Sequence, residues 1–378
     1  MRIWSFADLH TGKIKDVNYV YKVVCDMIDT EIHLNKTDLV VSCGDFFDRL
    51  LKTNDDFVSL AINIMSYLVR ACKKTNTKIR LVVGTESHEM SQYRLFNYHL
   101  NSKDVDVRVI DTVTEETING KKILYVPEEY VESKEDHYVR TLYSNARYDY
   151  IFGHGVIAEG MPMATFGNKS TNLEKRVPIF KTGELSKASH ITCFGHYHVH
   201  TRLGGGVYYI GSLFRDSHGE EEPKGYLIIE DDKVSFVENK DAYLYRTYRL
   251  SDDAEVYSDV EKLSSLISKI KKENKPIFEG EEFGKIRMLF DLPVNVDPSF
   301  KENLRTLLEN EKQISILVKE KTTAEQEVES TIEVEYDFIL DPSLPIGDKI
   351  HRYIGKQYPD FNISLKELTA LITEDLKI

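Results

Sequence analysis

The 378-residue chain lacks a long hydrophobic run, and this absence bears on where the protein works. No uninterrupted apolar stretch approaches the roughly 20 residues that a membrane-spanning helix needs. The amino-terminal MRIWSFADLH contains an acid and a histidine, which is not the layout of a signal peptide. We therefore expect a cytoplasmic protein that makes no contact with a membrane.

Cysteine is scarce, and its spacing excludes two classes of protein. Cys25, Cys43, Cys72 and Cys193 are scattered, without CxxC spacing, and each lies in an apolar run. Zinc knuckles and dithiol redox motifs need cysteines at short, regular intervals. The pattern therefore predicts buried free thiols rather than disulfides or a structural zinc site.

The chain also lacks an excess of positive charge. Its 49 Lys and Arg residues are outnumbered by 62 Asp and Glu residues, which gives a net charge of −13. A protein that grips nucleic acid by bulk electrostatics is basic, so the composition argues against that mode of binding. A polyanionic substrate stays possible, because two bound divalent cations would add about four positive charges at one point.

The first half of the chain alternates strand and helix patterns. Short apolar runs predict strands at 2–7, 38–43 and 78–83, and apolar residues at helical spacing predict helices at 17–34 and 57–72. Such alternation indicates βαβ units and a largely parallel sheet. From about residue 105 strand patterns dominate, which predicts a second sheet packed on the first. Its expected strands are 105–110, 121–126, 148–152, 190–194, 206–210, 225–229 and 233–238.

The pattern changes again near residue 250, so we expect a first domain over 1–250. Residues 251–320 combine helical patterns at 256–272 and 299–310 with strand patterns at 285–292 and 313–318, which predicts a small α/β domain. Residues 321–334 are polar and charged, as in a linker. Residues 335–378 suggest two amphipathic helices, which dock either on a partner or on their own chain.

Five short blocks place acids or histidines at the ends of apolar runs. The first three follow strands of the predicted parallel sheet, at the edge where open α/β sheets bind their ligands. We expect all five blocks to meet at one edge of one sheet. They are Asp8-Leu9-His10, Gly44-Asp45-Phe46-Phe47-Asp48, Gly84–Glu89 (GTESHE), Gly153-His154-Gly155 and Gly195-His196-Tyr197-His198.

The residue types in these blocks suit divalent metal ions. Asp8 and His10 stand two apart, so on an extended segment they share a face and can chelate one ion, and His196 and His198 repeat that spacing. Asp45 follows a strand and a glycine, where a carboxylate can bridge two metals. Taken alone, each block has an ordinary explanation, such as a helix cap at GDFFD or a solvated loop histidine at 88. Their coincidence favours a metal site with the ligands Asp8, His10, Asp45, His154, His196 and His198.

The ordered set DLH, GDFFD, a histidine-acid pair, GHG and GHYHVH resembles the calcineurin-like metallophosphoesterases. Within them, the chain is similar to SbcD-type nuclease subunits of recombination complexes, including bacteriophage versions. The resemblance implies an α/β, two-sheet metallophosphoesterase sandwich flanked by helices, with a small α/β capping domain and a carboxyl-terminal helical segment. It also implies two divalent cations, most often Mn²⁺, with Mg²⁺, Fe²⁺ or Zn²⁺ as alternatives.

The resemblance also distributes the residues between the two metals. It implies one metal on Asp8, His10, Asp45 and His198, and a second on Asp45, His154 and His196 with a residue of the third block. His88 would be the transition-state acid. The family usually reads Gly-Asn-His-Asp in the third block, where the asparagine binds the second metal. Here Ser87 precedes His88, and whether Ser87 or Glu86 replaces the asparagine is open.

The function implied by the resemblance is a metal-dependent DNA exonuclease or endonuclease of recombination and repair, which hydrolyses phosphodiester bonds with a metal-activated water. Its partners would be DNA, an SbcC-like SMC-type ATPase bound by the terminal helices, and a second copy in a homodimer. Its place would be the bacterial cytoplasm, in a phage-encoded version. The alternative is a metallophosphatase or small-molecule phosphodiesterase on the same site. A third hypothesis is a non-catalytic scaffold that recruits a partner through residues 335–378.

Overall fold

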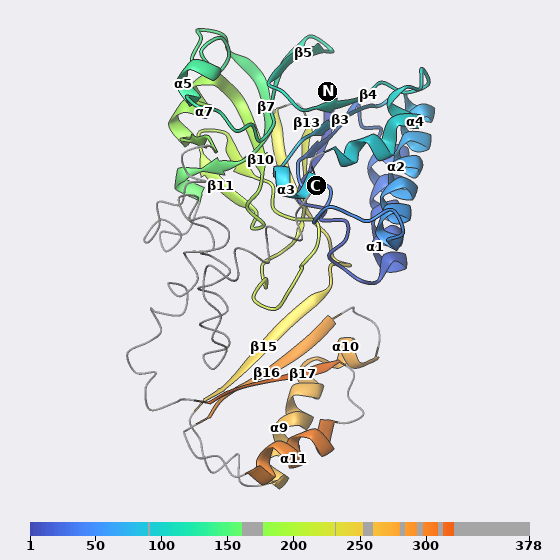
Figure 1. The fold of residues 1–378 in the computed structure, drawn as a ribbon, viewed down its shortest axis with the longest axis vertical. Coiled ribbons are helices and arrows are strands. Elements are labelled where there is room, and N and C mark those ends of the chain that lie inside the picture. Colours follow the sequence, from blue (N-terminus) through green and yellow to red (C-terminus); the bar gives the residue numbers. More distant parts are fainter. Residues whose placement is uncertain are drawn as a thin grey trace, which may run out of the picture. The chain divides into compact units, whose positions relative to one another are not determined.

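Two six-stranded sheets dominate the amino-terminal part of the protein (Figure 1). The computed structural model describes residues 1–89, 91–160, 177–230, 232–251, 260–279, 284–292, 298–308 and 313–320. The first sheet has the order β14-β13-β1-β2-β3-β4 and the second the order β11-β12-β10-β7-β6-β5. The strands of the first are β1 (Arg2–Phe6), β2 (Leu39–Cys43), β3 (Lys78–Val82), β4 (Val107–Ile110), β13 (Gly225–Glu230) and β14 (Lys233–Glu238). Those of the second are β5 (Thr114–Ile118), β6 (Lys121–Val126), β7 (Tyr148–His154), β10 (Ser189–Gly195), β11 (Thr201–Gly204) and β12 (Val207–Tyr209).

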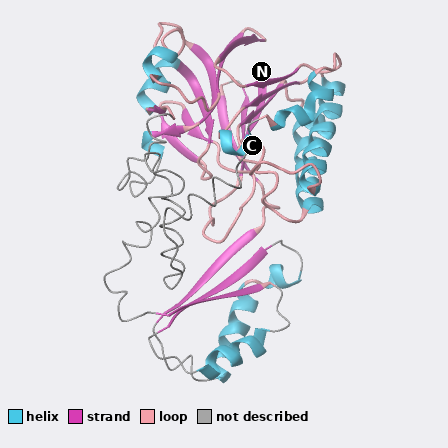
Figure 2. Cartoon of the chain, viewed as in Figure 1, coloured by secondary structure: helices cyan, strands magenta, loops and turns pink. Residues whose placement is uncertain are grey.

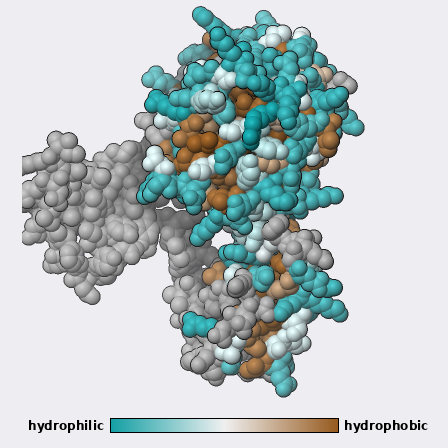
Figure 3. All heavy atoms as spheres, turned by 90° about the vertical axis from the view of Figure 1, so that its right-hand side faces the viewer, coloured by the Kyte–Doolittle hydropathy of each residue, from teal (hydrophilic) through white to brown (hydrophobic). Residues whose placement is uncertain are grey.

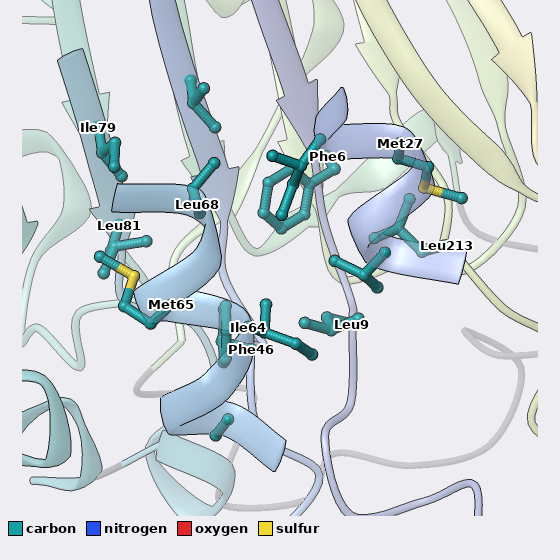
Figure 4. Close-up of a cluster of buried hydrophobic side chains, with 14 of the residues drawn as sticks. Phe6, Leu9, Met27, Phe46, Ile64, Met65, Leu68, Ile79, Leu81 and Leu213 are labelled. Carbon is teal, nitrogen blue, oxygen red and sulfur yellow. The ribbon is translucent and has the colours of Figure 1, made fainter. Parts of the chain in front are cut away.

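Two long helices pack on the first sheet. Helix α1 (Val17–Ile28) begins where the Asp16 side chain accepts the amide hydrogen of Tyr19 at 3.0 Å, which caps a free helix-end donor. It continues as a π-helical turn over Asp29–Leu34. Helix α2 (Asp56–Thr75) ends at Asn76, whose left-handed φ of 56° stops the helix. Figure 4 shows its buried face, where Ile64, Met65 and Leu68 lie with Ile79 and Leu81 of β3 in one apolar cluster.

Apolar clusters define the layers of this part. One lies between the first sheet and its helices, a second between the two sheets, and a third on the far face of the second sheet, where α7 (Thr182–Ala188) packs. Cys43 and Cys193 are buried in the cluster between the sheets, and all four cysteines are buried free thiols, as predicted. The predicted α/β fold of two sheets flanked by helices is confirmed.

The membership of three strands differs from the prediction. Residues 105–110, 225–229 and 233–238 were expected in the second sheet, but β4, β13 and β14 belong to the first. Strand β13 pairs antiparallel with β1, so the first sheet is mixed rather than largely parallel. The run Gly225–Ile229 is buried throughout, and such a run identifies an inner strand without showing which sheet it joins.

Shorter elements complete the described fold. Strands β5, β11 and β15 (Leu244–Ser251) have no counterpart in the predicted pattern, while β6 and β14 have the predicted bounds. The remaining short elements are α3 (Glu86–Glu89), a 3₁₀ turn at Gln92–Phe96, α4 (Asn97–Leu100), α5 (Lys134–His137), β8 (Val156–Ile157), a 3₁₀ turn at Ala158–Gly160 and β9 (Ile179–Phe180).

A three-stranded sheet in the order β15-β16-β17 follows in the chain (Figure 2). A division between compact units falls after Tyr248. The domain bounds 1–250 and 251–320 stay predictions, and the predicted linker 321–334 and helical segment 335–378 lie outside the described residues. The other elements here are α9 (Val260–Glu273), α10 (Lys275–Glu279), β16 (Gly284–Leu292), α11 (Pro298–Leu308) and β17 (Ile314–Glu320).

The face shown in Figure 3 is largely hydrophilic, with smaller hydrophobic patches among the polar side chains. Among the described residues, no helix is both long enough and apolar enough to cross a bilayer.

Candidate metal centre

The five blocks come together, but at the edges of two sheets rather than one. Blocks one to three follow β1, β2 and β3 of the first sheet, whereas blocks four and five follow β7 and β10 of the second. The amide of Asp8 donates to the carbonyl of Gly44 at 3.1 Å, and that of His10 to Asp45 at 3.0 Å. The amide of His196 donates to the Asp8 carboxylate at 3.1 Å, which ties the two sheets together. The expectation of a single sheet edge was wrong because the facing strand ends of the sandwich share one site.

The backbone at these blocks is strained. Only eight described residues other than glycine have positive φ, and four of them are predicted ligands. Such conformations cost about 1–3 kcal/mol each and persist where the surrounding structure enforces them, which marks functional sites. The four are Asp8 (φ 50°), His10 (φ 47°), Asp45 (φ 49°) and His196 (φ 94°).

Gly44 in the second block allows a close approach that no other residue would. Its φ is +82°, and a Cβ built there would lie 2.1 Å from Nδ1 of His154 and 2.8 Å from Cα of Gly84. Glycine therefore lets the first sheet's loop meet the histidine of the second sheet.

Asp8, His10 and His198 form the first cluster of possible ligands. Their ligand atoms lie within 4.8 Å of one another. Nε2 of His10 faces Nε2 of His198 at 3.0 Å, and it also lies 3.9 Å from Oδ2 of Asp45. Asp48 lies behind His10, with Oδ1 at 3.8 Å from Nδ1, and forms an ion pair with Lys13 at 3.3 Å. Asp48 thus faces a candidate ligand and not the cluster itself.

A second cluster surrounds His154, which is fully buried. Nδ1 of His154 donates to the carbonyl of Cys43 at 2.8 Å, and this bond turns Nε2 towards the site. Nε2 lies 3.5 Å from Oδ1 of Asp45. Asp45 contacts ligands of both clusters, as a bridging carboxylate must. The rings of His154 and His196 meet edge to face, with centroids 5.3 Å apart.

Two further residues at this second cluster were missed by the sequence analysis. Oε2 of Glu128 lies 3.4 Å from Nδ1 of His196 and 3.8 Å from Nε2 of His154. The hydroxyl of Thr85 lies 3.5 Å from that same Nε2 and 3.3 Å from Oδ2 of Asp45. The signal for Glu128 was present, because it stands two residues after the correctly predicted strand β6.

Ser87 and Glu86, the expected replacements for asparagine, do not face the clusters. Both are exposed in the short helix α3, which begins directly after Thr85. Thr85 precedes the helix, where its amide donates to Oδ1 of Asp45 at 2.7 Å. The turn at Gly84 therefore presents the first residue after the glycine to the site, and not the residue before His88.

His88 lies at the rim of the site. Its Nδ1 is 3.0 Å from Oδ2 of Asp45, and 32% of its side chain is exposed. The hydrogen bond to Asp45 raises the pKa of His88, which favours the protonated ring. A partly exposed imidazole that is hydrogen-bonded to Asp45 beside the ligand cluster is suited to proton donation.

Glu89 holds the backbone next to Asp45 and Thr85 in place. It is fully buried, and its carboxylate accepts the amides of Phe46 and Gly84 and the hydroxyl of Tyr93, the last at 2.8 Å. It thereby joins the second and third blocks. Burial raises the pKa of Glu89 to about 7.

The pKa values of Asp45, His154 and His10 are shifted by burial and by the charges of neighbouring groups. Burial alone would raise the pKa of Asp45, yet His154, His88 and His10 hold it well below its usual range. Burial would lower the pKa of His154, yet Asp45 and Asp8 raise it well above its ordinary value. Burial lowers the pKa of His10 to about 4, so its ring is neutral near pH 7 and can offer a lone pair.

The donor set fits divalent cations. Nδ1 of His10 is buried without a hydrogen-bond partner among the described residues, while its Nε2 faces another imidazole nitrogen. Donor atoms about 2.1 Å from one ion lie about 3.0–3.4 Å apart. The distance of 3.0 Å between His10 and His198 in the first cluster and that of 3.4 Å between Glu128 and His196 in the second fall in this range. Mixed imidazole and carboxylate ligands suit Mn²⁺, Fe²⁺ and Zn²⁺. The residues thus fit a two-metal centre.

No protein-family profile matches the chain, and no curated protein matches it in sequence. A solved structure of a dimetal phosphatase from Danio rerio is 9% identical, with a TM-score of 0.36 over 63% of this chain and 96% of its own. A protein of unknown function from Aquifex aeolicus is 16% identical, with a TM-score of 0.23 over 42% of this chain and 78% of its own. A third crystal structure is 10% identical, with a TM-score of 0.37 over 63% and 98%. Likenesses this loose establish neither a family nor a function.

Proposed function

We propose that the protein is a divalent-metal-dependent phosphoesterase. The observation that carries this proposal is Asp45, whose carboxylate lies between two clusters of imidazoles and acids. A carboxylate shared by two metal positions is the arrangement that two-metal hydrolases use for displacement at phosphorus. Bound divalent cations would supply Lewis-acid stabilisation of the phosphoryl oxygens and lower the pKa of a water.

The chain's own residues perform the remaining tasks. Asp8, His10 and His198 would hold one cation, His154 and His196 the other, and Asp45 both. The carbonyl of Cys43 orients His154, and Asp8 orients the backbone at His196. His88, held by Asp45, would donate a proton from its ring to the departing alkoxide.

The site supports hydrolysis of a phosphate ester by a metallophosphatase or a small-molecule phosphodiesterase better than it supports a particular polymer substrate. The contacts of Asp45 with His10 and His154 define a metal centre that can act on any phosphate ester that reaches it. The net charge of −13 adds no support for unaided DNA binding.

A DNA nuclease is the second candidate, and one feature favours it. The chain continues into β15-β16-β17 and three helices, an addition that a small substrate does not require. In this hypothesis the protein is the SbcD-type subunit of a complex with an SbcC-like ATPase, and acts on DNA as a homodimer. These partners are predictions from sequence.

The test is a comparison of substrates on the full chain after EDTA treatment and Mn²⁺ addition. We expect Mn²⁺-dependent turnover of bis-p-nitrophenyl phosphate or p-nitrophenyl phosphate, and turnover slower on the order of a thousandfold or more by Asp45→Asn. Faster cleavage of duplex DNA than of either small ester would favour the nuclease. Absence of turnover on all three substrates, with Mn²⁺ bound, would contradict the proposal and favour the scaffold hypothesis.

A further inference from the structure

Three neighbouring strands of the second sheet end at the same place, and each carries a polar side chain at or just after its last residue. Strands β6, β7 and β10 lie side by side and parallel, with Val126 paired to Gly153 and Gly195 paired to His154. Glu128 stands two residues beyond Val126, and His196 directly follows Gly195. Because the carboxyl ends of parallel strands meet at one edge of the sheet, Glu128, His154 and His196 lie close together.

Backbone and side-chain hydrogen bonds hold Glu128 in place. Its amide donates to the carbonyl of Val83 at 3.1 Å, which fixes the β6 loop to the end of β3. Its side chain is only 3% exposed. Tyr130 donates to Oε1 at 3.4 Å, and this contact leaves Oε2 for the histidines. A buried carboxylate needs charged or hydrogen-bonding partners, and here those partners are the second cluster.

Glu128 presents an oxygen atom to two imidazoles. Its Oε2 lies 3.4 Å from Nδ1 of His196 and 3.8 Å from Nε2 of His154. The ligand atoms of Glu128, His154 and His196 lie within 4.8 Å of one another.

We propose that Glu128 is a ligand of the second metal ion and that the hydroxyl of Thr85 completes its surroundings. This inference rests on the proposed function, since it concerns one half of the same centre. The hydroxyl of Thr85 lies 3.5 Å from Oε2 of Glu128 and 3.5 Å from Nε2 of His154, so it faces the same point. The neutral hydroxyl of Thr85 is a weak ligand for a cation, so the carboxylate of Glu128 would supply the negative charge at this position.

The assignment has a consequence for metal preference. Asp8, Asp45 and Glu128 together bring three carboxylates to a pair of divalent cations. Carboxylate ligands favour harder ions such as Mn²⁺ and Mg²⁺, whereas imidazole ligands favour ions such as Zn²⁺. We therefore expect removal of the Glu128 charge to weaken Mn²⁺ at the second position more than Zn²⁺.

The experiment is a Mn²⁺ titration of the full chain followed by the electron paramagnetic resonance of free Mn²⁺. We expect two ions per chain for the wild type and for the control Glu132→Gln, since Glu132 is exposed on the same loop. In Glu128→Gln one ion should keep its affinity and the other should bind at least tenfold more weakly. Gln retains the shape and can still accept from Tyr130, and circular dichroism checks the fold. Thr85→Val tests the hydroxyl separately, with a smaller loss at the same position.

The outcomes separate this inference from the proposed function. Two ions of unchanged affinity in Glu128→Gln would overturn the role of Glu128 and leave the phosphoesterase proposal standing. No binding of Mn²⁺ by the wild-type chain would overturn both. If Glu128→Gln and Glu132→Gln lost affinity equally, the effect would be general electrostatics, and Glu128 would not be a ligand.

Discussion

The two halves of the metal centre are built in different ways. Asp8 and His10 of the first half come from one short loop after β1, at a spacing of two residues, and His198 joins them from the loop after β10 of the second sheet. In the second half, Glu128, His154 and His196 come from the ends of three neighbouring strands of the second sheet, and Thr85 is added from the first. The ligands of the first half are thus divided between two sheets, whereas most of the second half is assembled by one. Both halves need the two sheets to pack together, the first through His198 and the second through Thr85.

Asp45 belongs to both halves, so its replacement should have the largest effect. Asp45→Asn removes the charge shared by the two clusters, and we expect hydrolysis to fall on the order of a thousandfold or more. Both Mn²⁺ affinities should drop in the same variant, measured by calorimetry. Loss of only one affinity would show that Asp45 serves one half alone and does not bridge the two metals.

His88 lies beside the first half, yet it should matter for turnover and not for metal. His88→Ala removes the proton donor at the rim, and we expect turnover to fall about 10²–10³-fold. Mn²⁺ stoichiometry should stay at the wild-type value. Equal turnover by the variant and the wild type would remove His88 from the mechanism.

Glu89 can be tested in the metal-free protein. It joins the second block to the third through the amides of Phe46 and Gly84. Burial raises its pKa to about 7, so the folded chain binds a proton that the unfolded chain releases between about pH 4.5 and 7. Stability should therefore fall by about 3 kcal/mol as the pH rises through that window. Urea unfolding at pH 5 and pH 7.5 in EDTA checks this, and Glu89→Gln should flatten the dependence. A steep dependence that persists in Glu89→Gln would assign the proton elsewhere.

Asp216 should show the smallest effect, confined to the first half. Its Oδ2 lies 3.9 Å from Nδ1 of His198, on the side away from His10, as does Oε1 of Glu220 at 3.8 Å. Replacing a carboxylate that contacts the back of a ligand histidine typically lowers metal affinity about 10–100-fold. At 3.9 Å Asp216 is too far from His198 for a hydrogen bond, so we expect an effect at the lower end. We expect Asp216→Asn to weaken one Mn²⁺ site about tenfold, with Glu221→Gln as the exposed control. An equal loss at both sites would show that the halves are not independent.

Much of the first half could be predicted because its signals are local. The β-branched run before Asp45 and the spacing of Asp8 and His10 depend only on neighbouring residues, and strand β6 was found with its bounds. What the sequence does not contain is strand order. Without it, Gly225–Ile229 was placed in the wrong sheet, and Glu128, although it follows a correctly predicted strand, could not be placed beside His154.

The third block shows a different limit. A motif comparison points to the residue before His88, which is Ser87. The structure presents Thr85 instead, because α3 starts at Glu86 and turns the following side chains outward. The direction of a side chain at a turn depends on backbone angles that residue types alone do not fix.

Anomalous scattering from bound manganese would show directly whether the centre holds two ions. A crystal of the full chain soaked in Mn²⁺ and measured at the manganese absorption edge would locate each bound ion by its anomalous signal. We expect two peaks, one contacted by Asp8, His10 and His198 and one by His154, His196 and Glu128, with Asp45 touching both. A single peak, or two peaks without Asp45 between them, would contradict the two-metal centre.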